Sequence, residues 1–112
     1  MGIQQWSELI WLVKLGDAAS IEEDLSLVRD QAIEADFMPH VVIDFSEVQH
    51  VNSSHLSLLL QLRKLAIDRD ARVKLAAMPD SIWAVFITTG LDKVFEFAEG
   101  VPTALAALQM NQ

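Results

Sequence analysis

The sequence contains no cysteine and no long apolar run. Without cysteine, the chain cannot use a disulfide scaffold, a thiolate metal site or a cysteine nucleophile. Polar residues interrupt each apolar stretch before it reaches about 18 residues, so we expect no membrane-spanning helix. Residues 1–6 are neither basic nor apolar enough for a secretory signal. We therefore expect a cytoplasmic protein that does not insert into membranes.

Positive charge is also scarce, with 8 basic residues against 16 acidic ones and a formal net charge of −8. This balance argues against a nucleic-acid backbone or an anionic lipid surface as the main partner. Acidic residues concentrate in the segment 17–36. The local excess of basic residues lies in segment 63–74, which we interpret as a solvated helix end that complements the helix dipole. The basic residues of this segment are Arg63, Lys64, Arg69, Arg72 and Lys74.

Glycine and proline are rare, at 4 and 3 residues, and no repeat or flexible linker divides the sequence. With 52% hydrophobic residues, the chain has enough apolar material to fold by itself. The three prolines stand where one predicted element gives way to the next. We therefore predict a single domain over residues 1–112.

Short strand patterns alternate with helical periodicity along the chain. We predict strands at 9–15, 41–45, 73–77 and 94–98, with 3–7 as a candidate hairpin partner of the first strand. Helices are predicted at 20–35, 56–70, 79–89 and Val101–Met110, the first of them begun by a Ser20–Glu23 capping box and the third ended by Gly90.

This order predicts the α/β class, with a small mixed, mostly parallel sheet of four to five strands and helices packed on it. The apolar segment 41–45 is the expected central strand. Functional residues of such sheets gather beyond the carboxyl ends of the strands. The segment 51–57, which follows the central strand, falls on that side.

Two serines, Ser53 and Ser54, fall at the expected start of the helix that leaves the central strand. A helix amino terminus favours anions, so a phosphate on either serine would not melt the helix. It would add about −1.5 to −2 of charge to an acidic surface and so could switch the binding of a partner. The plainer interpretation is that Asn52 or Ser53 is only the helix cap.

Catalytic, metal and cofactor sites fit the sequence less well. A hydrolase triad of Ser53, His55 and Asp44 lacks the G-x-S-x-G turn, and neighbouring helix positions do not face each other. His40, His50 and His55 have no metal-ligand spacing, and lone histidines of this kind are usually solvated. No glycine-rich phosphate loop is present. We expect no catalytic residues, no metal and no cofactor.

Four short motifs occur in a characteristic order. They are Leu-Gly-Asp at 15–17, Val-Ile-Asp-Phe-Ser at 42–46 with Val48, Val-Asn-Ser-Ser-His-Leu at 51–56, and Thr-Gly-Leu-Asp-Lys-Val-Phe at 89–95. Together they make the sequence similar, from Leu9 to about Leu108, to a STAS domain of the bacterial anti-sigma-factor antagonists. The fold of that family agrees with the predicted order of elements.

The resemblance implies a regulatory binding module that catalyses nothing. In the family, a kinase that is itself the anti-sigma factor phosphorylates the serine after an aspartate at the start of the second helix, and here that position is Ser53. Unmodified protein would bind the kinase and free a sigma factor, and a serine phosphatase would reset the phosphorylated form. Asn52, Ser54, His55 and Ser57 would then form the partner-binding surface.

The chain departs from the family pattern Asp-Ser-Ser/Thr-Gly at two positions, with Asn52 in place of the acid and His55 in place of the glycine. These departures favour an alternative, a STAS-type adaptor or scaffold subunit that is not phosphorylated and serves a signalling or transporter complex. The sequence leaves open the partner, the oligomeric state and the choice between Ser53 and Ser54.

Overall fold

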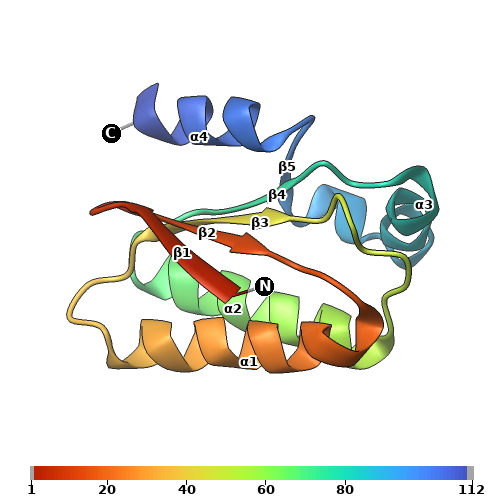
Figure 1. Cartoon of the computed structure of the whole chain (residues 1–112), viewed down its shortest axis with the longest axis horizontal. Helices are drawn as coiled ribbons and strands as arrows, with labels where there is room; N and C mark the ends of the chain where they lie inside the picture. The colour runs from red at the N-terminus through yellow and green to blue at the C-terminus, as the bar shows by residue number, and fades with distance from the viewer. Residues whose placement is uncertain (1, 111–112) are drawn as a thin grey trace.

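The computed structural model describes residues 2–110 and has the predicted α/β architecture (Figure 1). In chain order the elements are β1 (Gly2–Ser7), β2 (Ile10–Lys14), α1 (Ala18–Glu34), β3 (His40–Asp44), α2 (Ser53–Asp68), β4 (Val73–Ala76), α3 (Asp80–Thr89), the 3₁₀ helix η1 (Leu91–Lys93), β5 (Glu96–Ala98) and α4 (Val101–Met110). None of the described helices is long and apolar enough to cross a membrane.

The five strands form one sheet in the order β1-β2-β3-β4-β5. β1 runs antiparallel to β2, which confirms the hairpin, and the other neighbours are parallel. β3 is the central strand, as predicted. Parallel neighbours need crossover connections, and α1, α2 and α3 lie in these connections.

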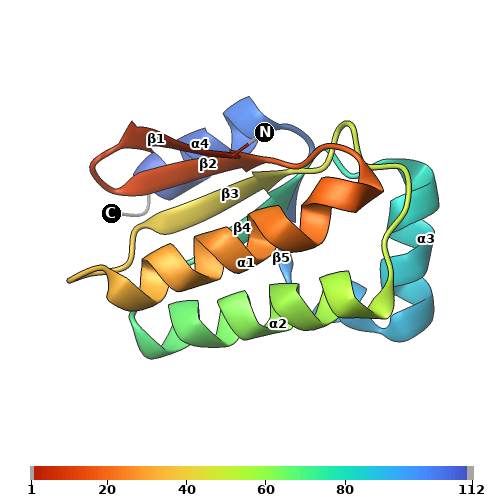
Figure 2. The same cartoon turned by 60° about the horizontal axis from the view of Figure 1, so that its bottom comes forward.

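Helices cover both faces of the sheet, α1 and α2 on one and α4 on the other (Figures 1 and 2). Val41, Val42 and Ile43 of β3 are fully buried. Val41 and Ile43 belong to the larger apolar cluster with α1 and α2, whereas Val42 belongs to the smaller cluster with α4. A strand that is buried on both faces has a nearly continuous apolar sequence, which is why this segment was recognisable.

The predicted start of the first helix was wrong by two residues. Helix α1 begins at Ala18, and its N-cap is Asp17, whose carboxylate accepts a hydrogen bond from the Ser20 backbone N–H at 3.2 Å. The Ser20 hydroxyl donates to the Asp17 carbonyl oxygen at 3.1 Å instead of capping. Asp17 comes earlier in the chain and is an equally good cap, so the helix begins there.

The basic segment is not a solvated helix end, because four of its five basic side chains tie distant elements together. Arg69 donates to the carbonyl oxygens of Ala32 and Ala35, at 2.7 and 2.6 Å, and so satisfies the carboxyl end of α1. Arg63 donates to the Val94 carbonyl oxygen at 3.0 Å. Lys64 alone fits the prediction, since it is exposed and pairs with a residue of its own helix.

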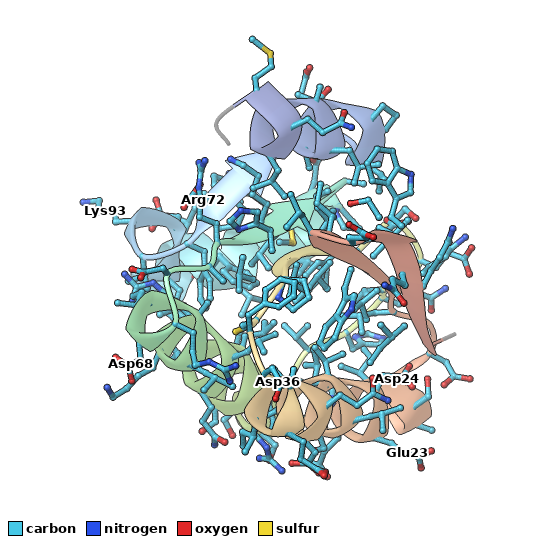
Figure 3. All side chains as sticks on the ribbon, turned by 90° about the vertical axis from the view of Figure 1, so that its left-hand side faces the viewer. Glu23, Asp24, Asp36, Asp68, Arg72 and Lys93 are labelled. Atoms are coloured by element: carbon cyan, nitrogen blue, oxygen red, sulfur yellow. The ribbon has the colours of Figure 1, made fainter. Side chains whose placement is uncertain are left out.

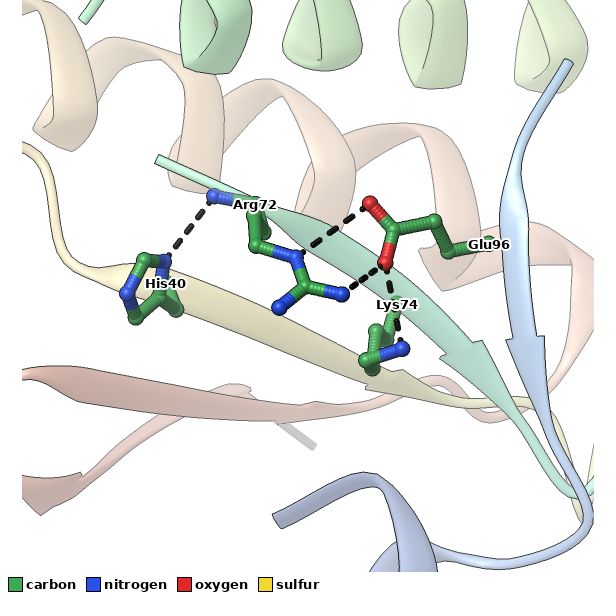
Figure 4. Close-up of polar contacts among 4 residues, drawn as sticks. All are labelled: His40, Arg72, Lys74 and Glu96. Carbon is green, nitrogen blue, oxygen red and sulfur yellow. Dashed lines mark hydrogen bonds and ion pairs between the residues drawn. The ribbon is translucent and has the colours of Figure 1, made fainter. Parts of the chain in front are cut away.

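Lys74, Arg72 and Glu96 form the densest ion-pair cluster of the described residues (Figure 4). The Lys74 side chain is buried, and its ammonium lies 3.1 Å from the Glu96 carboxylate, which also accepts from Arg72 at 2.6 Å. Desolvation raises the pKa of Glu96, but the hydrogen bonds and charges of the two cations outweigh it, so this pKa lies below its usual value. Beside them, the Arg72 backbone N–H donates to His40 Nδ1.

Three described residues near the ends of elements, Asp70, Ala77 and Gly90, adopt the left-handed conformation. Gly90, with φ of 78°, ends α3 and leads into η1, a short helix that the sequence did not predict. Ala77, with φ of 58°, follows β4. A side chain at positive φ strains the backbone, so glycine suits position 90 and alanine is costly at position 77.

Replacing Glu96 with glutamine should lower the free energy of unfolding by about 1–3 kcal/mol, because it leaves the Lys74 ammonium buried without a charged partner. Urea denaturation at neutral pH measures this change. Glu99→Gln, at an exposed residue without an ion pair in the described structure, is the control and should have little effect. Equal stability of Glu96→Gln and Glu99→Gln would contradict the role of Glu96 as the partner that stabilises the buried Lys74 ammonium.

Replacing Gly90 with alanine should lower the free energy of unfolding by about 1 kcal/mol, because alanine resists the positive φ that ends α3. Ala77→Gly is the reverse exchange at a similar φ and should leave stability unchanged or raise it, since it removes strain. Thermal unfolding of both variants tests the pair. If Ala77→Gly loses as much stability as Gly90→Ala, the positive φ at these positions is not the cause of the loss.

Candidate functional site

The candidate site is the first turn of α2, which follows β3 through the loop 45–52. The turn lies at the same end of the molecule as α3 in both orientations (Figures 1 and 2). This end carries the carboxyl ends of the parallel strands, so the location agrees with the prediction.

Asn52 and His55 form a reciprocal capping box at the start of α2. The Asn52 side-chain oxygen accepts from the His55 backbone N–H at 2.9 Å, and His55 Nδ1 accepts from the Asn52 backbone N–H at 3.2 Å. In this motif, position N3 usually carries glutamate or glutamine, and an imidazole nitrogen fills the same role here. The two departures from the family pattern therefore act as one structural unit, and Asn52, not Ser53, is the cap.

The imidazole of His55 is buried, with 3% of the residue exposed, so the expectation of a solvated histidine was wrong. Burial lowers the pKa of His55, and the Glu22 carboxylate of α1 opposes this effect only in part. The folded state thus favours the neutral ring, which keeps Nδ1 free to accept its hydrogen bond. His55 fixes the turn from inside and does not present its ring to a partner.

Ser53, Ser54 and Ser57 are exposed, and within residues 2–110 their hydroxyl groups have no hydrogen-bond partner. Asn52 is exposed as well, although its side chain is held by the cap. The structure therefore brings four of the five predicted site residues together on the surface. Each of the three hydroxyls is therefore accessible from solvent.

A shallow groove of about 290 Å³ between α1 and α2 adjoins the serines. It is lined by Glu22, Ser26, Ser54, Ser57, Leu58 and Gln61. The α1 residues of this groove are not predictable from the sequence, because no local signal shows that α1 lies beside α2. The spacing of Glu22 and Ser26, one helical turn apart, was the available signal that they share a face.

Ser53, His55 and Asp44, the residues of the hydrolase triad considered above, form no hydrogen bonds with one another in the described structure. His55 Nδ1 is occupied by the Asn52 N–H, and the Asp44 carboxylate accepts from the Ser46 N–H at 2.9 Å. Neither group forms a hydrogen bond with the Ser53 hydroxyl, so no base activates this oxygen in the structure described. Among the described residues, no group of three or more side chains of metal-ligand type could hold a metal ion.

A protein-family model described as "Mlab, STAS domain" matches residues 17–103, more than three quarters of the chain. The chain belongs to this STAS-domain family. A search of curated proteins found no match.

Solved structures of low sequence identity share the fold. An anti-sigma-factor antagonist (STAS) domain protein from Planctomyces limnophilus is 19% identical, with a TM-score of 0.80 over 97% of this chain and 99% of that one. The anti-sigma factor antagonist SpoIIAA in its unphosphorylated form is 12% identical, with a TM-score of 0.76 over 96% of each chain. A sulfate transporter family protein from Wolinella succinogenes is 13% identical, with a TM-score of 0.79 over 93% of this chain and 88% of that one.

The His55 cap should make stability depend on pH. The folded-state pKa lies below the ordinary value of 6.5, so the stabilisation is present above that value and is lost as the pH falls through the folded-state pKa. His55→Gln keeps an acceptor at N3 but does not titrate. Its free energy of unfolding should therefore fall less than that of the unchanged protein between about pH 7.5 and about pH 5.5.

His50→Gln is the matched control, because His50 lies exposed in the preceding loop. This variant should keep the pH dependence of the unchanged protein. Chemical denaturation of the three proteins at each pH makes the comparison. If His55→Gln and His50→Gln behave alike, the capping box is not the source of the effect.

Proposed function

We propose that this chain is a cytoplasmic anti-sigma-factor antagonist that binds an anti-sigma-factor kinase through the first turn of α2 and is switched by phosphorylation of Ser53. The module acts by binding and catalyses nothing. A serine phosphatase returns it to the binding form. Ser54, Ser57 and the exposed edge of Asn52 form the contact surface around the phosphoacceptor, and His55 supports that surface from below.

The observation that carries the proposal is the exposed, unpartnered Ser53 hydroxyl on a helix start that is already capped. Ser53 is the first residue of α2, where the free backbone N–H groups and the helix dipole favour negative charge. A phosphate would therefore leave the fold intact. The phosphate would instead weaken the binding of the partner, because a dianion in the interface repels negative charge and is costly to desolvate.

Ser53 is a better phosphoacceptor than Ser54 for an electrostatic reason. Ser54 lines the groove that also contains the Glu22 carboxylate, and Ser53 does not. A phosphate on Ser54 would be placed beside a like charge, at a cost that Ser53 avoids.

A second candidate function is an adaptor that binds its partner through the same surface without being phosphorylated. The capping box favours it, because Asn52 replaces the family's aspartate and its side chain is engaged with the His55 N–H. No carboxylate is then available at this position to orient the Ser53 hydroxyl. A sulfate transporter family protein has the same fold, which is compatible with such a role in a transporter complex.

Incubation of the purified protein with ATP in a lysate of its native cells, with phosphatases inhibited, should place one phosphate on Ser53. Peptide mass mapping of residues 51–62 detects it. Ser54→Ala should still be phosphorylated and Ser53→Ala should not. Both variants keep the Asn52 cap, so a difference between them reports on the acceptor and not on the helix.

The partner recovered on unmodified protein should also bind Ser53→Ala and should bind Ser53→Asp at least about tenfold more weakly. Ser81→Asp, an exposed serine at the start of α3, adds the same charge and should have a smaller effect. If Ser53 carries no phosphate and the partner binds Ser53→Asp as tightly as the unmodified protein, the switch is rejected and the adaptor is supported.

A further inference from the structure

Charged residues are absent from one contiguous part of the surface. No charged residue occurs in segments 2–7, 9–13 or 100–110, although 21% of the chain is charged. These segments contain β1, all of β2 except Lys14, and α4. We call their exposed surface the neutral face; Glu8 in the β-turn and Lys14, which pairs with Glu47, lie at its borders.

The members of the neutral face are neighbours in space. Leu105 and Leu108 of α4 belong to the same apolar cluster as Ile10 of β2, and Leu12 packs against this cluster. β1 pairs with β2 and forms an edge of the sheet. Figures 1 and 2 show α4 on the face of the sheet opposite α1 and α2, where it lies mainly over β3, β4 and β5.

Large apolar side chains are exposed on this face. Trp6 in β1 is 37% exposed, Leu9 in the turn before β2 is 45% exposed, and Met110 at the end of α4 is 84% exposed. Tryptophan and methionine are enriched in protein interfaces, and charged residues are depleted from interface cores. The neutral face has both properties.

The opposite layer of the molecule carries much of the acidic charge. Figure 3 shows the labelled Glu23, Asp24 and Asp36 around α1 and Asp68 on α2, with α4 at the far side of the sheet. Two copies of a chain with net charge −8 repel each other when these layers meet. Contact through the neutral face brings together segments that carry no charged residue of their own.

We propose that the neutral face is the interface of a homodimer, in which two copies of this chain associate about a two-fold axis. In such an interface each patch contacts its own copy, so an uncharged patch is complementary to itself. β1 contributes an edge strand. Its six residues include neither proline nor a charged residue, and these are the residues that usually prevent an edge strand from pairing with another chain. The first turn of α2 lies outside this face, so both copies keep Ser53 exposed. The dimer does not depend on the proposed function.

Sedimentation velocity of the full chain from about 1 µM to about 500 µM should show a monomer–dimer equilibrium. The double variant Gln4→Glu with Gln109→Glu places acidic groups on the neutral face of both copies and should weaken dimerisation by roughly tenfold. The matched control, Gln31→Glu with Gln49→Glu, makes the same exchange at exposed glutamines outside the face and should change it less than about twofold.

Salt gives an independent readout. Raising ionic strength from about 0.05 M to about 0.5 M should strengthen the dimer, because it screens the repulsion between the two net charges while a neutral interface has no ion pairs to lose. Circular dichroism confirms that each variant is folded. A monomer at every concentration overturns the proposal, and so does a dimer that weakens with salt or responds equally to the two double variants.

Discussion

The burial of β3 on both faces is the constraint on which the rest of the structure depends. Val41, Val42 and Ile43 are fully buried, so neither face of this strand can be left to solvent. One face requires α1 and α2, and the other requires α4. The parallel crossovers that bring these helices into place also direct the start of α2 to the carboxyl end of β3, where the candidate site lies. The site is therefore a consequence of how the central strand is covered.

Much of the fold was predictable because its signals are local. The apolar run of β3, the glycine that ends α3 and the cap residue Asn52 are each visible in a few consecutive residues. Contacts between distant segments were not predictable in this way. The position of Arg69 against the end of α1 and the burial of Lys74 against Glu96 depend on pairings across more than twenty residues.

The site shows the same division between local and distant signals. Exposed serines at the start of a helix follow from the sequence, since cap residues mark the position. The inward orientation of His55 does not, because a histidine at this position fits either the surface or the interior. Once buried, it completes the cap with Asn52, so the two departures from the family pattern compensate each other structurally. They change the side chains at the start of α2 while preserving its cap.

The contact of Arg69 with α1 has a mechanical consequence. α1 and α2 are parallel, so their carboxyl ends lie together and their partial negative charges repel. The guanidinium of Arg69, at the end of α2, is shared between the carbonyl oxygens of Ala32 and Ala35 and clamps the two ends. Sliding of one helix along the other would break both hydrogen bonds at once. These two hydrogen bonds therefore hold the carboxyl ends of α1 and α2 in a fixed position relative to each other.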